Sequence, residues 1–84
     1  MEDQKYWHII YKSRTVSRLD GDLKLGDWVQ AETVSRQHPI MWEVESRKYA
    51  RRAQNENKPY MWVKLLFYSE INFELYCAVI NEMD

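Results

Sequence analysis

The chain has 84 residues, a formal net charge of −1 and one cysteine, and 14% of its residues are aromatic. This length predicts a single domain over residues 1–84, with a modest core that large aromatic side chains help to fill. A near-neutral charge excludes strong overall steering toward nucleic acid, and one cysteine excludes an internal disulfide or a cysteine-based zinc site. Because no apolar run approaches the roughly 20 residues of a membrane span, and no apolar leader follows Met1, we expect a cytoplasmic protein without a membrane partner.

The first element that the sequence predicts is an aromatic strand over residues 5–14. From Tyr6 to Tyr11, every side chain except His8 is aromatic or β-branched, which is typical of strands. We interpret His8 as a structural residue of this strand, because a lone histidine among apolar neighbours is more often structural than catalytic.

A hairpin is the next predicted feature. Asp20-Gly21 suits a type I′ turn, in which both central residues have positive φ, and this turn would join strands over residues 15–19 and 22–25. Residues 28–33 alternate like a further strand. The competing interpretation makes them a short helix capped by the preceding aspartate, but the run is short and bounded by glycine and polar residues, so we favour the strand.

A helix start is indicated by Pro39, because a proline at the first helical position gives up an N–H that would have no intrahelical partner. His38 would then occupy the N-cap. One side of the following helical wheel carries Trp42 and Tyr49, and we expect both rings to pack against the sheet. A competing interpretation makes residues 40–45 a strand.

A central strand is predicted after Pro59, a residue through which a helix could not continue. Residues 60–68 are largely apolar on both faces, as expected when both sides of a strand are covered. We expect one continuous core face from alternate residues, namely Met61, Val63, Leu65 and Phe67.

A final helix is predicted after Asn72, a favourable N-cap residue, with Glu74 near the positive end of the helix dipole. We expect its buried stripe to comprise Ile71, Leu75, Ala78 and Val79. The opposite face comprises Phe73, Tyr76, Cys77 and Ile80. Because both faces are apolar, the helix would be deeply buried or would cover a partner, and we expect Cys77 to be a buried, unreactive thiol. The competing interpretation makes residues 75–80 a strand.

Together these elements predict a small α+β domain in β-β-α-β-α order, with helices packed on an antiparallel-rich sheet. Three motifs carry a resemblance to short phage and mobile-element proteins: an aromatic strand at 6–11, a His-Pro helix start with a following Trp at 38–43, and a Leu-rich strand ending in Glu-Ile at 63–71. The resemblance covers about half of the chain. It implies this fold order and a phage or prophage origin, and it implies no activity.

The sequence shows no group of residues typical of a catalytic or metal-binding site. Nucleophilic catalysis needs a nucleophile, a base and an orienting group within reach, and no motif joins Cys77 to His8 or His38. The aspartates near the two glycines lack the spacing of a calcium loop, and no glycine-rich phosphate loop is present. We therefore expect a non-enzymatic protein with no catalytic residues, no metal site and no cofactor.

The clearest candidate interaction feature is the basic run at 47–52. Two apolar residues precede it on the outward side of the predicted helix, so that this side begins apolar and ends basic. The candidate partner-binding residues are Ile40, Val44, Arg47, Lys48, Arg51 and Arg52.

Three kinds of partner fit this pattern. The first is a protein, because interfaces mix apolar anchors with arginine, and the resemblance extends this hypothesis to a phage-derived inhibitor of a host or defence protein. The second is nucleic acid bound by the basic helix at 46–54, against which the near-neutral net charge argues. The third is a homodimer or larger assembly formed through the last helix. The basic run is also compatible with a solvated helix face.

Overall fold

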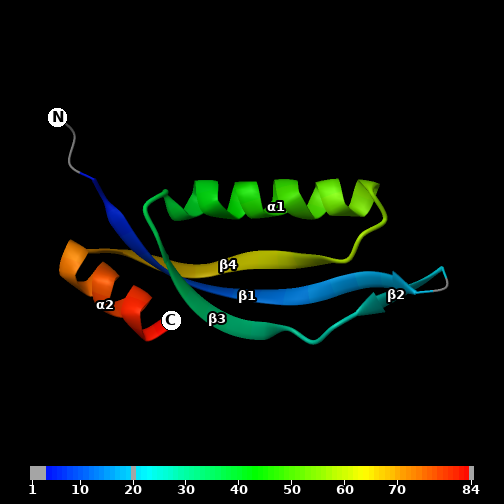
Figure 1. The fold of residues 1–84 in the computed structure, drawn as a ribbon, viewed down its shortest axis with the longest axis horizontal. Helices are drawn as coiled ribbons and strands as arrows, with labels where there is room; N and C mark the ends of the chain where they lie inside the picture. Colours follow the sequence, from blue (N-terminus) through cyan, green and yellow to red (C-terminus); the bar gives the residue numbers. More distant parts are fainter. Residues whose placement is uncertain (1–3, 20, 84) are drawn as a thin grey trace.

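The computed structural model describes residues 4–19 and 21–83, which form one antiparallel sheet and two helices (Figure 1). Its elements are β1 (Tyr6–Leu19), β2 (Asp22–Leu25), β3 (Val29–Ser35), α1 (Pro39–Asn55), β4 (Tyr60–Ile71) and α2 (Phe73–Met83). The predicted α+β class is confirmed. The order is β-β-β-α-β-α, with one more strand before the first helix than the predicted order contained. Neither helix in the described part is long and apolar enough to cross a membrane.

One long strand, β1, organises the sheet. It runs unbroken for 14 residues, where we expected two strands, and β4 pairs with it along most of this length. The opposite edge of β1 is shared, since β3 pairs with its first half and β2 with its second half. Of the predicted turn, Asp20 lies outside the described residues, while Gly21 has the positive φ of 86° that the turn requires. The shared edge makes the molecule long and narrow, with extents of 50 × 26 × 21 Å.

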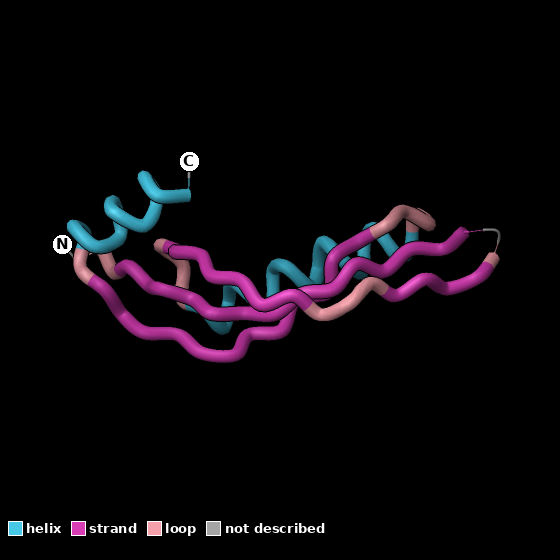
Figure 2. Tube along the Cα trace, turned by 90° about the horizontal axis from the view of Figure 1, so that it is seen from below, coloured by secondary structure: helices cyan, strands magenta, loops and turns pink. Residues whose placement is uncertain are grey.

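The two helices lie on opposite sides of this sheet. In Figure 1 the strands run between α1 and α2, and Figure 2 shows α1 behind the strands and α2 at one end of the molecule. On the α1 side, the ring of Trp42 lies 5.1 Å from that of Tyr11. On the α2 side, the ring of Tyr6 lies 4.7 Å from that of Tyr76. The predicted packing of Trp42 against the sheet is therefore confirmed.

The start of α1 is held by the cap that the sequence predicts. Nδ1 of His38 accepts a hydrogen bond from the Ile40 N–H at 3.2 Å, and Pro39 is fully buried in the first turn. The imidazole also lies 4.8 Å from the ring of Trp7 and 5.4 Å from that of Tyr68. Backbone capping and aromatic packing thus fix the helix start together.

The prediction that Tyr49 packs against the sheet is wrong, because its side chain is 69% exposed. The other residues expected on this side of the helical wheel do face the sheet, with Ala50 buried and Ser46 and Ala53 half-buried, so that the contact is centred on small side chains. Small side chains let the helix approach the strands closely. Tyr49 consequently lies at the flank of the contact.

The continuous core face predicted for β4 is also wrong: Met61 is 50% exposed, and a β-bulge turns Phe67 to the other face. Ile10 pairs with Phe67 and Tyr11 with Leu65, so that Leu66 is an extra residue without a partner. An extra residue reverses the alternation of side chains beyond it. Phe67 therefore turns to the other face and is 60% exposed, whereas Val63 is buried as expected.

The last helix forms as predicted but presents the opposite side to the sheet. The Leu75 N–H donates to Oδ1 of Asn72 at 2.8 Å, which confirms the N-cap. Phe73 and Tyr76 contact Tyr6, while Leu75 of the predicted buried stripe is exposed. The stripe prediction is wrong because both faces of this helix are apolar, so that periodicity alone could not choose between them.

The outer edge of β4 is closed by a side chain of α1. The backbone N–H of Leu65 donates to the carboxylate of Glu43, which also lies 3.6 Å from the guanidinium of Arg47. An edge strand otherwise leaves such donors free to pair with other chains. Glu43 therefore joins α1 to the sheet by a charge-assisted hydrogen bond.

Replacing Glu43 should weaken this junction. We expect Glu43→Ala to lower the free energy of unfolding by about 1–3 kcal/mol, because the part-buried Leu65 N–H loses its acceptor. Glu43→Gln, which keeps an acceptor oxygen, should cost less. Glu45→Ala is the matched control on the exposed side of α1. Equal urea midpoints for Glu43→Ala and Glu45→Ala would contradict the role of Glu43.

The cap of α2 yields a second stability prediction. Asn72→Ala removes the acceptor for the Leu75 N–H and should cost about 0.5–2 kcal/mol in urea unfolding. Asn81→Ala, an exposed change within the same helix, is the control and should be nearly neutral. A loss at Asn81 as large as that at Asn72 would show that the cap is unimportant.

Candidate functional site

The molecule exposes more surface than its mass predicts. Its accessible surface is 6566 Å² for 10.3 kDa, whereas a folded monomer of this mass is expected to expose about 5,400 Å². Its radius of gyration is 15.2 Å, compared with about 12 Å for a compact domain of this length. An open shape of this kind leaves side chains exposed that a rounder domain would bury.

Apolar side chains account for much of this surface. Among the described residues, the buried apolar core comprises Ile9, Val16, Ala50 and Val63. Large exposed apolar side chains outnumber these buried ones and come from both helices, from β2, β3 and β4, and from the loop before β3. Contiguous exposed apolar surface is typical of sites that bind a partner. Two surfaces of the molecule combine such side chains with charged ones.

The first such place is the solvent side of α1, which we call the helix face. It comprises Ile40, Met41, Val44, Lys48, Arg51 and Arg52, all exposed. Five of the six residues predicted to bind a partner lie here, and Met41 adds an apolar side chain that sequence reasoning omitted. Apolar residues occupy the first turns and cations the last ones, as the helical wheel predicts.

Arg47, the sixth predicted residue, belongs elsewhere. Its guanidinium lies 5.1 Å from the centroid of the Trp62 ring on β4 and 3.6 Å from the Glu43 carboxylate. Its Nε is buried and has no hydrogen-bond partner among the described residues. The prediction that Arg47 shares the outward side is therefore wrong, because α1 lies along β4 and brings this position within reach of Trp62.

The second place is one face of the sheet, which sequence reasoning missed. In the register of β1 and β4, Ile10 lies opposite Phe67, Lys12 opposite Lys64 and Arg14 opposite Trp62. The ring of Trp28, in the loop before β3, lies 4.8 Å from Nζ of Lys12 and 5.0 Å from the guanidinium of Arg14. We call this mixed surface the sheet platform; it comprises Lys12, Arg14, Trp28, Trp62, Lys64 and Phe67.

A local sequence signal for the sheet platform does exist. Lys12 and Arg14 alternate on β1, and Lys64 interrupts an otherwise apolar strand. Alternate cations on strands point to one face. That these cations of β1 and β4 lie side by side depends on the register in which the two strands pair, which the sequence does not reveal.

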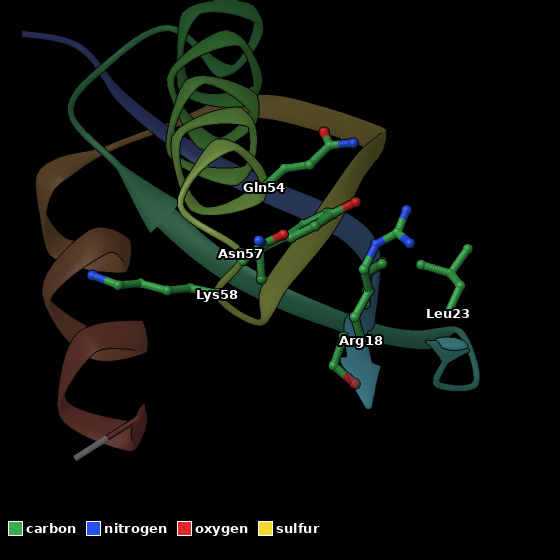
Figure 3. A pocket seen from close by; sticks show the side chains of 8 residues that line it. Arg18, Leu23, Gln54, Asn57 and Lys58 are labelled. Atoms are coloured by element: carbon green, nitrogen blue, oxygen red, sulfur yellow. The ribbon is translucent and has the colours of Figure 1, made fainter. Parts of the chain in front are cut away.

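A small pocket lies at the far end of β1, near the end of α1. Its lining includes Arg18, Leu23, Gln54, Asn57, Lys58 and Tyr60. Figure 3 shows Lys58 extending away from Arg18, and its Nζ lies 3.1 Å from the Glu56 carboxylate. The two cations therefore do not converge into a pocket for a small anion.

The histidines and the cysteine have separate structural settings. Nε2 of His8 lies 2.9 Å from the Glu32 carboxylate, His38 caps α1, and Cys77 is half-buried in α2. Within residues 4–19 and 21–83, no three His, Cys, Asp or Glu side chains gather closely enough to hold a metal ion. The two surfaces defined above are accordingly the candidate functional sites.

Comparison with known proteins suggests no function, so that these two surfaces are the basis for inferring one. No family model, curated protein or solved structure matches the chain. The resemblance to phage proteins stays a prediction that depends on three short motifs.

Proposed function

We propose that the protein is a non-enzymatic protein-binding module that docks through the helix face. The observation that carries this proposal is the exposed apolar group of Ile40, Met41 and Val44, with Ile40 52% exposed, on a helix that continues into Lys48 and Arg51. Apolar anchors beside cations with long aliphatic stems are typical of protein interfaces. The excess surface of the free chain supports the same proposal.

The helix face is presented rigidly, which favours binding. The His38 cap, the aromatic contacts of the imidazole and the Glu43 bond to β4 hold α1 in place before any partner arrives. A surface that is already ordered loses less conformational entropy on association. A helix laid into an apolar groove is one recurring mode of such recognition.

The charges of the helix face indicate what the partner offers. Lys48, Arg51 and Arg52 are exposed, so that a complementary partner carries acidic side chains around an apolar groove. The resemblance to phage proteins makes a host or defence protein in the cytoplasm the partner class to test first, with the chain acting there as an inhibitor.

Two paired variants test the helix face. Ile40→Ser with Val44→Ser removes the apolar anchors, and Lys48→Glu with Arg51→Glu reverses the cations. We expect each pair to reduce partner recovery from native-host lysate at least tenfold, as about 1.4 kcal/mol of lost binding implies. The melting temperature should stay unchanged because these side chains are exposed.

The control for this experiment is Leu75→Ser, which makes the same kind of change at an exposed position of α2. It should leave recovery of the partner unchanged. Recovery that is unaffected by both paired variants would exclude the helix face as the docking site, and a lower melting temperature would show that the positions are structural.

A second candidate function, self-association through α2, is favoured by the exposure of Phe73 and Leu75. A copy of the chain could cover these side chains and bury apolar surface that the monomer leaves in water. Light scattering between micromolar and millimolar concentration should then show a rising mass. A constant monomer mass over this range would dispose of this candidate.

A further inference from the structure

We propose that the sheet platform binds single-stranded nucleic acid. This site is distinct from the helix face and from the basic segment of the first helix at 46–54. The inference comes from three properties of the platform: the common direction of its side chains, the exposure of its rings, and cations that take part in no ion pair found among residues 4–19 and 21–83.

The common direction follows from strand register. Residues directly opposite each other on paired strands point to the same face of a sheet, and Lys12–Lys64 and Arg14–Trp62 are such pairs. Phe67 joins them because the bulge at Leu66 shifts the alternation of β4. The platform is therefore one surface, although its residues come from three segments of the chain.

The rings of the platform are available for stacking. Phe67 is 60% exposed and Trp28 is 40% exposed, while Trp62 is half-buried and is supported by the guanidinium of Arg47. Bases stack on such rings with little regard to sequence, provided that they are not already stacked in a duplex. The rings thus favour a single strand over a double helix.

The charge of the platform is positive although the chain as a whole is not. The ion pairs found among residues 4–19 and 21–83 involve none of Lys12, Arg14 and Lys64. The nearby Glu32 is engaged by His8. A backbone phosphate placed among the three cations would receive charge-assisted contacts without first displacing a carboxylate.

The direct pairing of Lys12 with Lys64 strengthens the case for an anion. Like charges opposite each other on adjacent strands destabilise a sheet. A phosphate group between them would remove this repulsion. The repulsion between Lys12 and Lys64 therefore raises the free energy of the unbound protein more than that of the complex. A ligand site needs such a difference in interaction between the two states.

The same face is long enough for several nucleotides. From Ile10 to Arg18, β1 covers about 27 Å at roughly 3.4 Å per residue. Sheet-based sites for single strands accommodate on the order of 4–16 nucleotides, so a 12-mer is a suitable probe.

The test is fluorescence anisotropy with labelled oligo-dT and oligo-rU 12-mers and a matched DNA duplex at 50 mM salt. We expect one or both single strands to bind more tightly than the duplex. Three phosphate contacts predict a slope of about −2 in a plot of log K against log salt. The two single strands distinguish DNA from RNA as the ligand, and binding of either supports the proposal.

Two variants locate the site. Phe67→Ala removes an exposed ring and should weaken binding about 5- to 150-fold, the range for losing one stacked base. Lys12→Gln with Lys64→Gln should weaken binding and flatten the salt slope to about one third, while removing the like-charge pair should keep or raise the melting temperature.

Two matched controls lie on α1. Tyr49→Ala removes another exposed ring, and Lys48→Gln with Arg51→Gln removes two other cations; both should leave oligonucleotide binding within twofold of the parent protein. The proposal is overturned if neither single strand changes the anisotropy, if the duplex binds equally well, or if the α1 variants lose binding and the platform variants do not. Loss of protein capture in Phe67→Ala without any oligonucleotide binding would also overturn it, and would assign the platform to a protein partner.

Discussion

The structure depends on the hydrogen-bonded ladder of β1. Within the described residues, each of the other strands pairs with β1 and with no other strand, so this one element connects the whole sheet. Ile9 on β1 is completely buried, and the aromatic contacts to both helices also begin on this strand at Tyr6, Trp7 and Tyr11. Both functional proposals therefore concern surfaces that β1 holds in place.

Dividing one edge of β1 between β2 and β3 explains why so much surface is available. Two short strands placed end to end lengthen a sheet without widening it, so that the two helices cover only part of its faces. α1 follows β4, and α2 covers the end near Tyr6. The helix face and the sheet platform are the surfaces that remain exposed. They differ in chemistry, because the helix face combines aliphatic side chains with cations and the sheet platform combines aromatic rings with cations.

Local features could be predicted from the sequence because neighbouring residues determine them. The His38-Pro39 helix start and the Asn72 cap are examples, since each needs a side chain within three residues of its backbone partner. Features that depend on distant pairing could not be predicted. The bulge at Leu66 is visible only against β1, and it inverted the expected direction of Phe67. Tyr49 was misplaced for a related reason, because its burial depends on where α1 crosses the sheet.

The pairing of β1 with β4 also sets the order in which the fold can assemble. β1 and β2 are joined by a tight turn, so that this hairpin can form soon after both strands leave the ribosome. Val16 pairs with Tyr60, so even the nearest β1–β4 contact closes a loop of about half the chain. Until β4 has been synthesised, one side of β1 has unpaired backbone groups, which leaves the nascent chain open to pairing with other strands. The strand that connects the finished sheet is thus also the one that needs protection during synthesis.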